Sequence, residues 1–140
     1  MLALALGAPG LKDPAAKANP LIGEWTLEST AVSGRVQRAI EDMRDEFTPD
    51  GKWLRYRSGK KVMSDGQYTL HPKIDERAID LKVRIDNRDF PEIQAIFKVE
   101  GDTLTICLAQ DGRTVRPTDF EIPKDNQTGL FVFKRVKKKD

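Results

Sequence analysis

The chain has 140 residues, of which 39% are hydrophobic and 33% charged, and a formal net charge of +2 at pH 7. This length fits one domain with its own core, and the near balance of charges argues against a nucleic-acid partner, which needs a strong basic excess. Cys107 is the single cysteine, so a disulfide-stapled secreted scaffold is excluded.

Residues 1–20 are predicted to form a flexible N-terminal segment outside the fold. Their apolar stretch, residues 2–9, is much shorter than the roughly 20 residues of a membrane-spanning helix, so the chain is not expected to span a membrane. The stretch is similar to the end of a signal peptide but lacks a basic start. A signal-peptide remnant and an apolar, disordered terminus both stay open, and we favour export (periplasmic or extracellular) over a cytoplasmic location.

The first predicted strand begins at Leu21, because apolar and polar residues alternate over residues 21–28. A second pattern follows, in which apolar residues recur at spacings of four, three and four with charged residues between them. These residues are Val36, Ile40, Met43 and Phe47. This spacing predicts one short amphipathic helix after the first strand.

Short alternating runs separated by turn residues continue through the rest of the chain. They cover residues 52–57, 60–63, 67–70, 78–85, 93–100, 103–108, 114–122 and 129–136. Gly101-Asp102 lies between two of these runs and predicts a hairpin, whereas Pro117 weakens the prediction for residues 114–122. About eight short antiparallel strands predict a sandwich or a barrel, and a closed barrel leaves no exposed edge.

Two sets of residues carry a resemblance to a known family. Gly23-Glu24-Trp25 is similar to the Gly-x-Trp motif that opens lipocalins. The second set consists, in chain order, of Leu21–Trp25, Tyr68–Pro72, Ala78–Leu81, Phe97–Ala109, Arg116–Phe120 and Phe133–Arg135. Together they make residues 21–136 resemble the planctomycete-type lipocalin-like domain of unknown function, a bacterial family. The chain departs from the family pattern at His71, where Asp is usual, and at Ala95–Phe97, where Gly-Ile-Tyr is usual.

The resemblance implies a single antiparallel lipocalin-like β-barrel over residues 21–136, followed by a basic tail at residues 137–140. In lipocalins the tryptophan of the motif closes one end of the barrel and packs against a basic residue of the last strand. Gly23, Trp25 and Arg135 stand at the matching positions, and a guanidinium over an indole is a favourable pairing. The family has no established biochemical role, so the resemblance leaves the function open.

No catalytic or metal-binding pattern is recognisable. His71 is the only histidine, and one histidine without suitably spaced cysteines or carboxylates does not make a zinc site. No serine lies in a nucleophile elbow, and the carboxylates lie among lysines and arginines in polar turns. Cys107 has no adjacent cationic group to activate it and is interpreted as a small packing residue. We therefore expect no enzyme activity, no cofactor and no metal.

The favoured hypothesis is a binding domain that takes a small, largely apolar molecule at the open end of the barrel. Its candidate ligand-binding residues are Tyr56, Tyr68, Phe97 and Arg116. For Arg116 two roles stay open, anchoring on a carboxylate or binding an anionic ligand group. The alternative is a structural or protein-interaction domain with a filled core and no ligand. An enzyme that uses surface carboxylates is the weakest hypothesis.

Overall fold

The computed structural model describes residues 19–39, 42–62, 65–109, 115–124 and 128–137. In these residues eleven strands form one antiparallel sheet, and no helix is present. The strands are β2 (Gly23–Val32), β3 (Arg35–Arg38), β4 (Met43–Phe47), β5 (Trp53–Arg57), β6 (Lys60–Lys61), β7 (Asp65–Leu70), β8 (Ala78–Ile85), β9 (Arg88–Asp89), β10 (Ile93–Glu100), β11 (Thr103–Ala109) and β12 (Thr128–Arg135). The prediction of a mainly β, antiparallel fold is confirmed.

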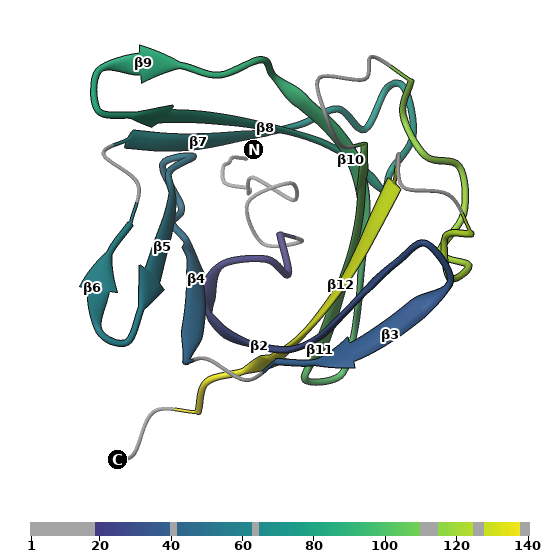
Figure 1. The fold of residues 1–140 in the computed structure, drawn as a ribbon. Helices are drawn as coiled ribbons and strands as arrows, with labels where there is room; N and C mark the ends of the chain where they lie inside the picture. The colour runs from purple at the N-terminus through teal and green to yellow at the C-terminus, as the bar shows by residue number, and fades with distance from the viewer. Residues whose placement is uncertain (1–18, 40–41, 63–64, 110–114, 125–127, 138–140) are drawn as a thin grey trace, which may run out of the picture.

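The sheet curls into an open barrel, which Figure 1 shows in a view down the barrel axis. Its strand order is β6-β5-β4-β2-β12-β11-β10-β8-β7, with β3 added on β2 and β9 on β8. Among the described residues, the backbones of the two ends of this order pair at an isolated bridge between Lys52 and Gln67, beside which the Tyr68 amide donates to the Gly51 carbonyl at 2.9 Å. The predicted closed barrel is therefore wrong. Because β6 has only two residues, it cannot pair with β7 along its length.

The predicted helix after the first strand is also wrong, because β3 and β4 occupy that part of the chain. Met43 and Phe47 lie on one face of β4 together with Asp45, and all three are buried. A spacing of four residues places two side chains on the same face in a strand as well as in a helix, so the pattern did not distinguish the two. Ile40 lies outside the described residues, and Val36 is exposed on β3.

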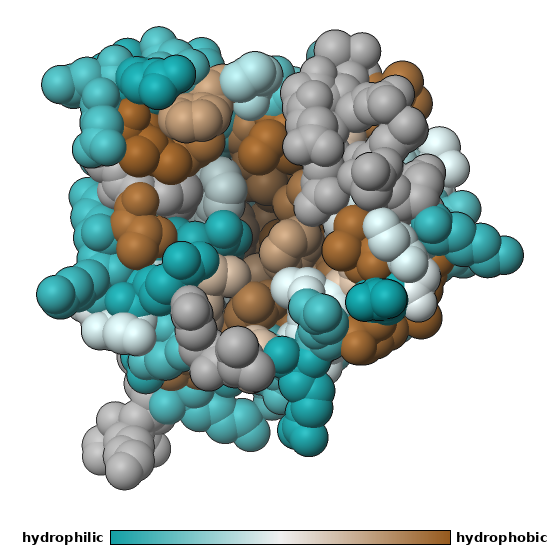
Figure 2. Space-filling view, viewed as in Figure 1, coloured by the Kyte–Doolittle hydropathy of each residue, from teal (hydrophilic) through white to brown (hydrophobic). Residues whose placement is uncertain are grey.

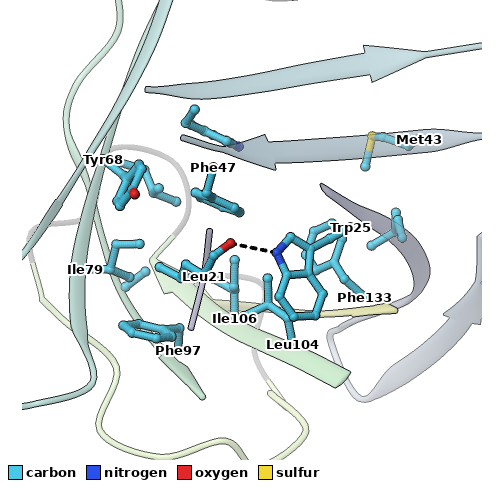
Figure 3. Packing of buried hydrophobic residues seen from close by; sticks show 14 residues of the cluster. Leu21, Trp25, Met43, Phe47, Tyr68, Ile79, Phe97, Leu104, Ile106 and Phe133 are labelled. Carbon is cyan, nitrogen blue, oxygen red and sulfur yellow. Dashed lines mark hydrogen bonds between the residues drawn. The ribbon is translucent and has the colours of Figure 1, made fainter. Parts of the chain in front are cut away.

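The inner face of the curled sheet carries the main core. Its buried members are Leu21, Trp25, Leu27, Met43, Phe47, Trp53, Tyr68, Ile79, Leu81, Ala95, Phe97, Leu104, Ile106 and Phe133. Figure 3 shows Leu21 at the centre of this cluster, between Tyr68 and Trp25. Leu21 precedes the first strand and is fully buried, so the chain enters the sheet across the floor of the barrel.

A shift of register between β2 and β12 turns the side chains of the second half of β2 to the other face of the sheet. Before the shift, Leu27 pairs with Phe133, and both point into the core. After it, Ala31 pairs with Leu130, and both point outward into a second, smaller cluster with Ile96 and Cys107. An extra residue in one strand of a pair, a β-bulge, allows this change of face.

Residues 115–124 cross the outer face of the sheet in an irregular conformation, so the weak strand predicted over residues 114–122 is not formed in its described part. Phe120 packs on the outer cluster. The Gly34 amide donates to the Pro123 carbonyl at 2.6 Å, which joins this segment to the turn between β2 and β3. A proline at position 117 cannot donate to a ladder, which explains why this segment does not join the sheet.

Most of the predicted N-terminal segment and most of the basic tail lie outside the described residues, which begin at Asn19 and end at Lys137. Within the part of the chain that is described, no helix has the length and apolar character needed to cross a membrane.

Candidate ligand-binding site in the barrel

One end of the barrel is closed by Trp25, whose side chain is fully buried. Its indole Nε1–H donates to the Leu21 carbonyl at 2.9 Å, and the Arg135 Cζ lies 4.3 Å from the ring centroid. Gly23 starts the strand with a φ of +129°, and a Cβ built there would lie 3.8 Å from Arg135 Nη1. Space is therefore adequate at position 23, and the positive φ is what favours glycine. The structure thus brings Gly23, Trp25 and Arg135 together.

Tyr68 lies on the inner face near the same end. Its hydroxyl donates to the Thr48 carbonyl at 2.5 Å and accepts from Asn19 Nδ2 at 3.1 Å. Its ring meets Phe47 edge to face, with centroids 5.2 Å apart. Burial raises the pKa of the Tyr68 phenol above its usual value. Phe97 is also buried in this core, so the structure places Tyr68 and Phe97 in the packed part of the interior.

Farther from the end that holds Trp25, the side chains of the inner face are less tightly packed. Several apolar side chains there pack on the core but stay only partly buried: Val83, Ile93, Leu108 and Phe131. Their inward direction follows from the pairing of Ile93 with Leu81 and of Phe131 with Ile106, because paired residues share a face. Figure 2, viewed along the barrel, shows a hollow in the middle of this face with hydrophobic side chains around it.

The wall formed by β4 and β5 differs from the rest because its inner face becomes polar away from the closed end. The paired residues along this face are Phe47 with Trp53, Asp45 with Arg55, and Met43 with Arg57. The first pair is buried and aromatic, the second is an ion pair, and Arg57 of the third is exposed. The interior therefore has an apolar floor and one charged wall.

Asp45 is 1% exposed and has a partner for each carboxylate oxygen. Arg55 Nε donates to Oδ1 at 2.8 Å and Arg55 Nη2 to Oδ2 at 2.9 Å, while Trp53 Nε1 donates to Oδ2 at 3.1 Å. A two-point arginine–carboxylate pair fixes the plane of the guanidinium. Sequence reasoning missed this group. The only available signal is that Trp53, Arg55 and Arg57 alternate with Leu54 and Tyr56, and of these residues only Tyr56 was predicted to bind the ligand.

Tyr56 lies on the outer face of β5, opposite to the core face that carries Trp53. There it lines a shallow depression of about 270 Å³ with Glu24, Asp42, Arg44 and Gly59. The structure therefore does not bring Tyr56 to Tyr68, and the expectation that both tyrosines contact one ligand inside the barrel is wrong for Tyr56.

Arg116 is on the outer face as well, where it anchors the segment that crosses the sheet. Its Nη2 donates to Asp80 Oδ1 at 2.7 Å, and its Nη1 donates to the carbonyls of Ile79 and Ala95 at 3.0 and 2.8 Å. The other oxygen of Asp80 lies 2.7 Å from His71 Nε2. Of the two roles left open for Arg116, this geometry matches anchoring on a carboxylate, outside the barrel.

A groove of about 610 Å³ runs between the sheet and residues 115–124, with Cys107 and Arg116 among its lining residues. Near it the Arg77 guanidinium hydrogen-bonds Asp75 and lowers the pKa of that carboxyl to about 2. Within the described residues, no group of three or more His, Cys, Asp or Glu side chains is placed to hold a metal ion.

No family model matches the chain, and neither a curated protein nor a solved structure matches it. The geometry of the interior and of the outer face therefore carries the functional argument.

Proposed function

We propose that this chain is a non-catalytic, lipocalin-like binding domain that takes a small apolar molecule into the open part of its barrel. The observation that carries the proposal is the contrast within the inner face. Its floor is packed tightly around Trp25, whereas Val83, Ile93 and Leu108 remain partly exposed. Apolar side chains that line a concave surface are the usual walls of a small-molecule site.

The family assignment is part of the same proposal. It rests on the Gly23-Glu24-Trp25 motif, on Arg135 over the indole, and on the order of antiparallel strands that curl around the core. The first and last long strands, β2 and β12, are neighbours in the sheet. This pairing is a feature of sheets that curl toward closure.

Binding can be tested with a neutral lipophilic fluorescent probe and with native mass spectrometry of the gently purified protein. We expect saturable probe binding and a reproducible co-purifying mass. Val83→Gln places an amide on the hollow's wall and should weaken probe binding about tenfold, the effect of roughly 1.4 kcal/mol. Ile122→Gln, on the exposed outer segment, is the matched control and should leave binding unchanged.

The competing function is a structural or protein-interaction domain with a filled core. It is supported by the fourteen buried residues of the main cluster, which fill the closed half of the barrel. A protein that shows no bound mass and binds no lipophilic probe would favour this alternative. Equal binding by wild type and Val83→Gln would mean that the probe binds elsewhere.

A further inference from the structure

Arg55 presents unused hydrogen-bond donors on the inner face of the sheet. Its side chain is 24% exposed, and Asp45 occupies only the edge formed by Nε and Nη2. A guanidinium has five N–H donors, so three remain without an acceptor among the described residues, and both terminal nitrogens carry at least one of them. These two form a second, parallel pair of donors of the kind that grips a carboxylate or a phosphate.

The remaining donors of Arg55 have no acceptor among the described residues. No acceptor among the described residues receives a hydrogen bond from Arg55 Nη1, and in this part of the chain every buried side-chain nitrogen or oxygen has a partner. Nη1 is therefore not buried. Trp53 donates to the Asp45 carboxylate, and Asp45 in turn fixes the plane of the Arg55 guanidinium. The free edge of Arg55 is therefore oriented before any ligand arrives, which lowers the entropic cost of binding.

The sequence around Arg55 adds positive charge along β5 and at its open end. Between Gly51 and Met63 the cationic residues are Lys52, Arg55, Arg57, Lys60 and Lys61, and there is no acidic residue. Arg57 lies two residues farther along the same face as Arg55, and Lys60 and Lys61 form β6 beyond the turn. A cationic hairpin beside the hollow attracts anions and excludes cations.

Figure 1 shows β10, β11 and β12 across the barrel from this wall. Ile93, Leu108 and Phe131 are the partly buried residues of that side. The interior is therefore amphipathic: one wall offers an oriented guanidinium and the other an apolar surface. A purely apolar ligand would leave the free donors of Arg55 unpaired, which is costly in a site shielded from water.

We propose that the ligand of the barrel is an anionic amphiphile, with an apolar body against β10–β12 and a carboxylate or phosphate head group on the free edge of Arg55. This inference rests on the proposed binding function and narrows it to a class of ligand. The head group is recognised by Arg55, with Asp45 and Trp53 as positioning residues.

The test compares three ligands that share one alkyl chain: dodecanoate, dodecyl phosphate and dodecanol. Each is titrated against the full chain by displacement of a neutral fluorescent probe at low salt. Wild type should bind at least one of the two anions about tenfold more tightly than the alcohol, as a charge-assisted hydrogen-bond pair predicts. The carboxylate and phosphate arms then show which head group the site prefers.

Arg55→Gln should abolish the preference for the anion while leaving the affinity for dodecanol unchanged. Arg84→Gln is the matched control, because Arg84 is an arginine paired with Asp89 on the outer face of β8, and it should keep the preference. If Arg55→Gln does not fold, as judged by circular dichroism, the salt dependence of ligand binding by wild type tests the head-group inference instead. Anion binding should weaken with added salt, and dodecanol binding should not.

The outcomes separate the two proposals. If wild type binds none of the three ligands, the binding function itself is wrong. If it binds dodecanol as tightly as both anions, or if its anion binding does not respond to salt, the barrel is a binding site but the head-group inference is overturned. An anion preference that survives in folded Arg55→Gln would also overturn it.

Discussion

Arg135 of the last strand lies over the indole of Trp25 in the first long strand, with 4.3 Å between the guanidinium carbon and the ring centroid. Arg135 also reaches Asp102 in the hairpin between β10 and β11, with 3.4 Å between Nε and Oδ1. One side chain thus joins two strands, β2 and β12, to the turn between β10 and β11 at the closed end of the barrel. Because Trp25 is fully buried, this contact covers one of the two tryptophans of the core.

Removing the cation should weaken the closed end by a modest amount. Arg135→Gln is expected to lower the free energy of unfolding by about 0.5–1 kcal/mol, the usual contribution of a cation–π contact whose cation reaches water, and the Arg135 side chain is 30% exposed. Trp25→Ala should cost about 3–5 kcal/mol, because it leaves a large cavity. Urea denaturation of the two single variants and the double variant measures the coupling between them. Strict additivity would show that Arg135 does not act through the indole.

The buried ion pair between Asp45 and Arg55 should contribute more to the free energy of unfolding than a surface pair of the same chemistry. Asp45→Asn keeps an acceptor for Trp53 but leaves the charge of Arg55, whose side chain is only 24% exposed, without its counter-ion. We expect a loss of about 2–3 kcal/mol, below the full cost of breaking a buried pair because Arg55 reaches water. Denaturant unfolding measures it.

The control for this change is Asp42→Asn. Asp42 pairs with Arg44 at 3.7 Å, and both side chains are about half exposed. An exposed pair of this kind contributes little, so the control should match wild type within experimental error. Equal losses in Asp45→Asn and Asp42→Asn would contradict the assignment of Asp45 as an interior anchor.

Strict alternation predicted the central strands well. The runs at residues 78–85 and 93–100 coincide with β8 and β10, because one face of each carries an unbroken apolar series that only the core can take. Gly101-Asp102 was predicted as a hairpin turn, and β10 and β11 do pair from Glu100 and Thr103 onward.

The prediction failed where the interior is not purely apolar. In β4 and β5 the inward series contains Asp45, Arg55 and Arg57, which a rule based on hydrophobicity assigns to solvent. These charges are tolerable inside because Asp45 and Arg55 neutralise each other, a pairing between strands that no local pattern reveals. The same rule directed Tyr56 inward, although it lies outside. The openness of the barrel depends on the short β6 edge and could not be read from periodicity either.

Arg116 should control how firmly residues 115–124 cover the outer face. Arg116→Gln removes the hydrogen bonds from the guanidinium to Asp80 and to the carbonyls of Ile79 and Ala95. Residues 115–124 should therefore detach from the sheet more often. Cys107 lies beneath it and is 1% exposed, which makes it a reporter. Its rate of reaction with a thiol reagent should rise about tenfold through local opening.

Exchange of the Gly34 amide, which donates to Pro123, should accelerate in the same variant. Arg84→Gln, which removes an exposed ion pair on β8, should change neither rate. If Cys107 reacts in Arg116→Gln at the wild-type rate, Arg116 is not what holds the segment on the sheet, and its exposed edge would have to be reconsidered as a ligand contact.

Tyr68 should make the stability of the protein sensitive to alkali. Burial raises its pKa in the folded state, whereas the unfolded phenol loses its proton near the usual value of about 10. Above that pH the unfolded state binds fewer protons than the folded state, so stability falls as pH rises through the folded pKa. Tyr68→Phe cannot titrate and loses the bonds to Thr48 and Asn19, which should cost about 1–2 kcal/mol at neutral pH.

The difference in unfolding free energy between wild type and Tyr68→Phe should therefore be largest below about pH 10 and shrink above it. Urea denaturation at a series of pH values gives this difference directly. Tyr56→Phe, on the outer face, controls for the loss of a tyrosine hydroxyl and should not reproduce the pattern. A difference that stays constant from neutral pH into strong alkali would show that the Tyr68 phenol ionises equally easily in both states, and that the floor of the barrel is wetter than its packing around Phe47 implies.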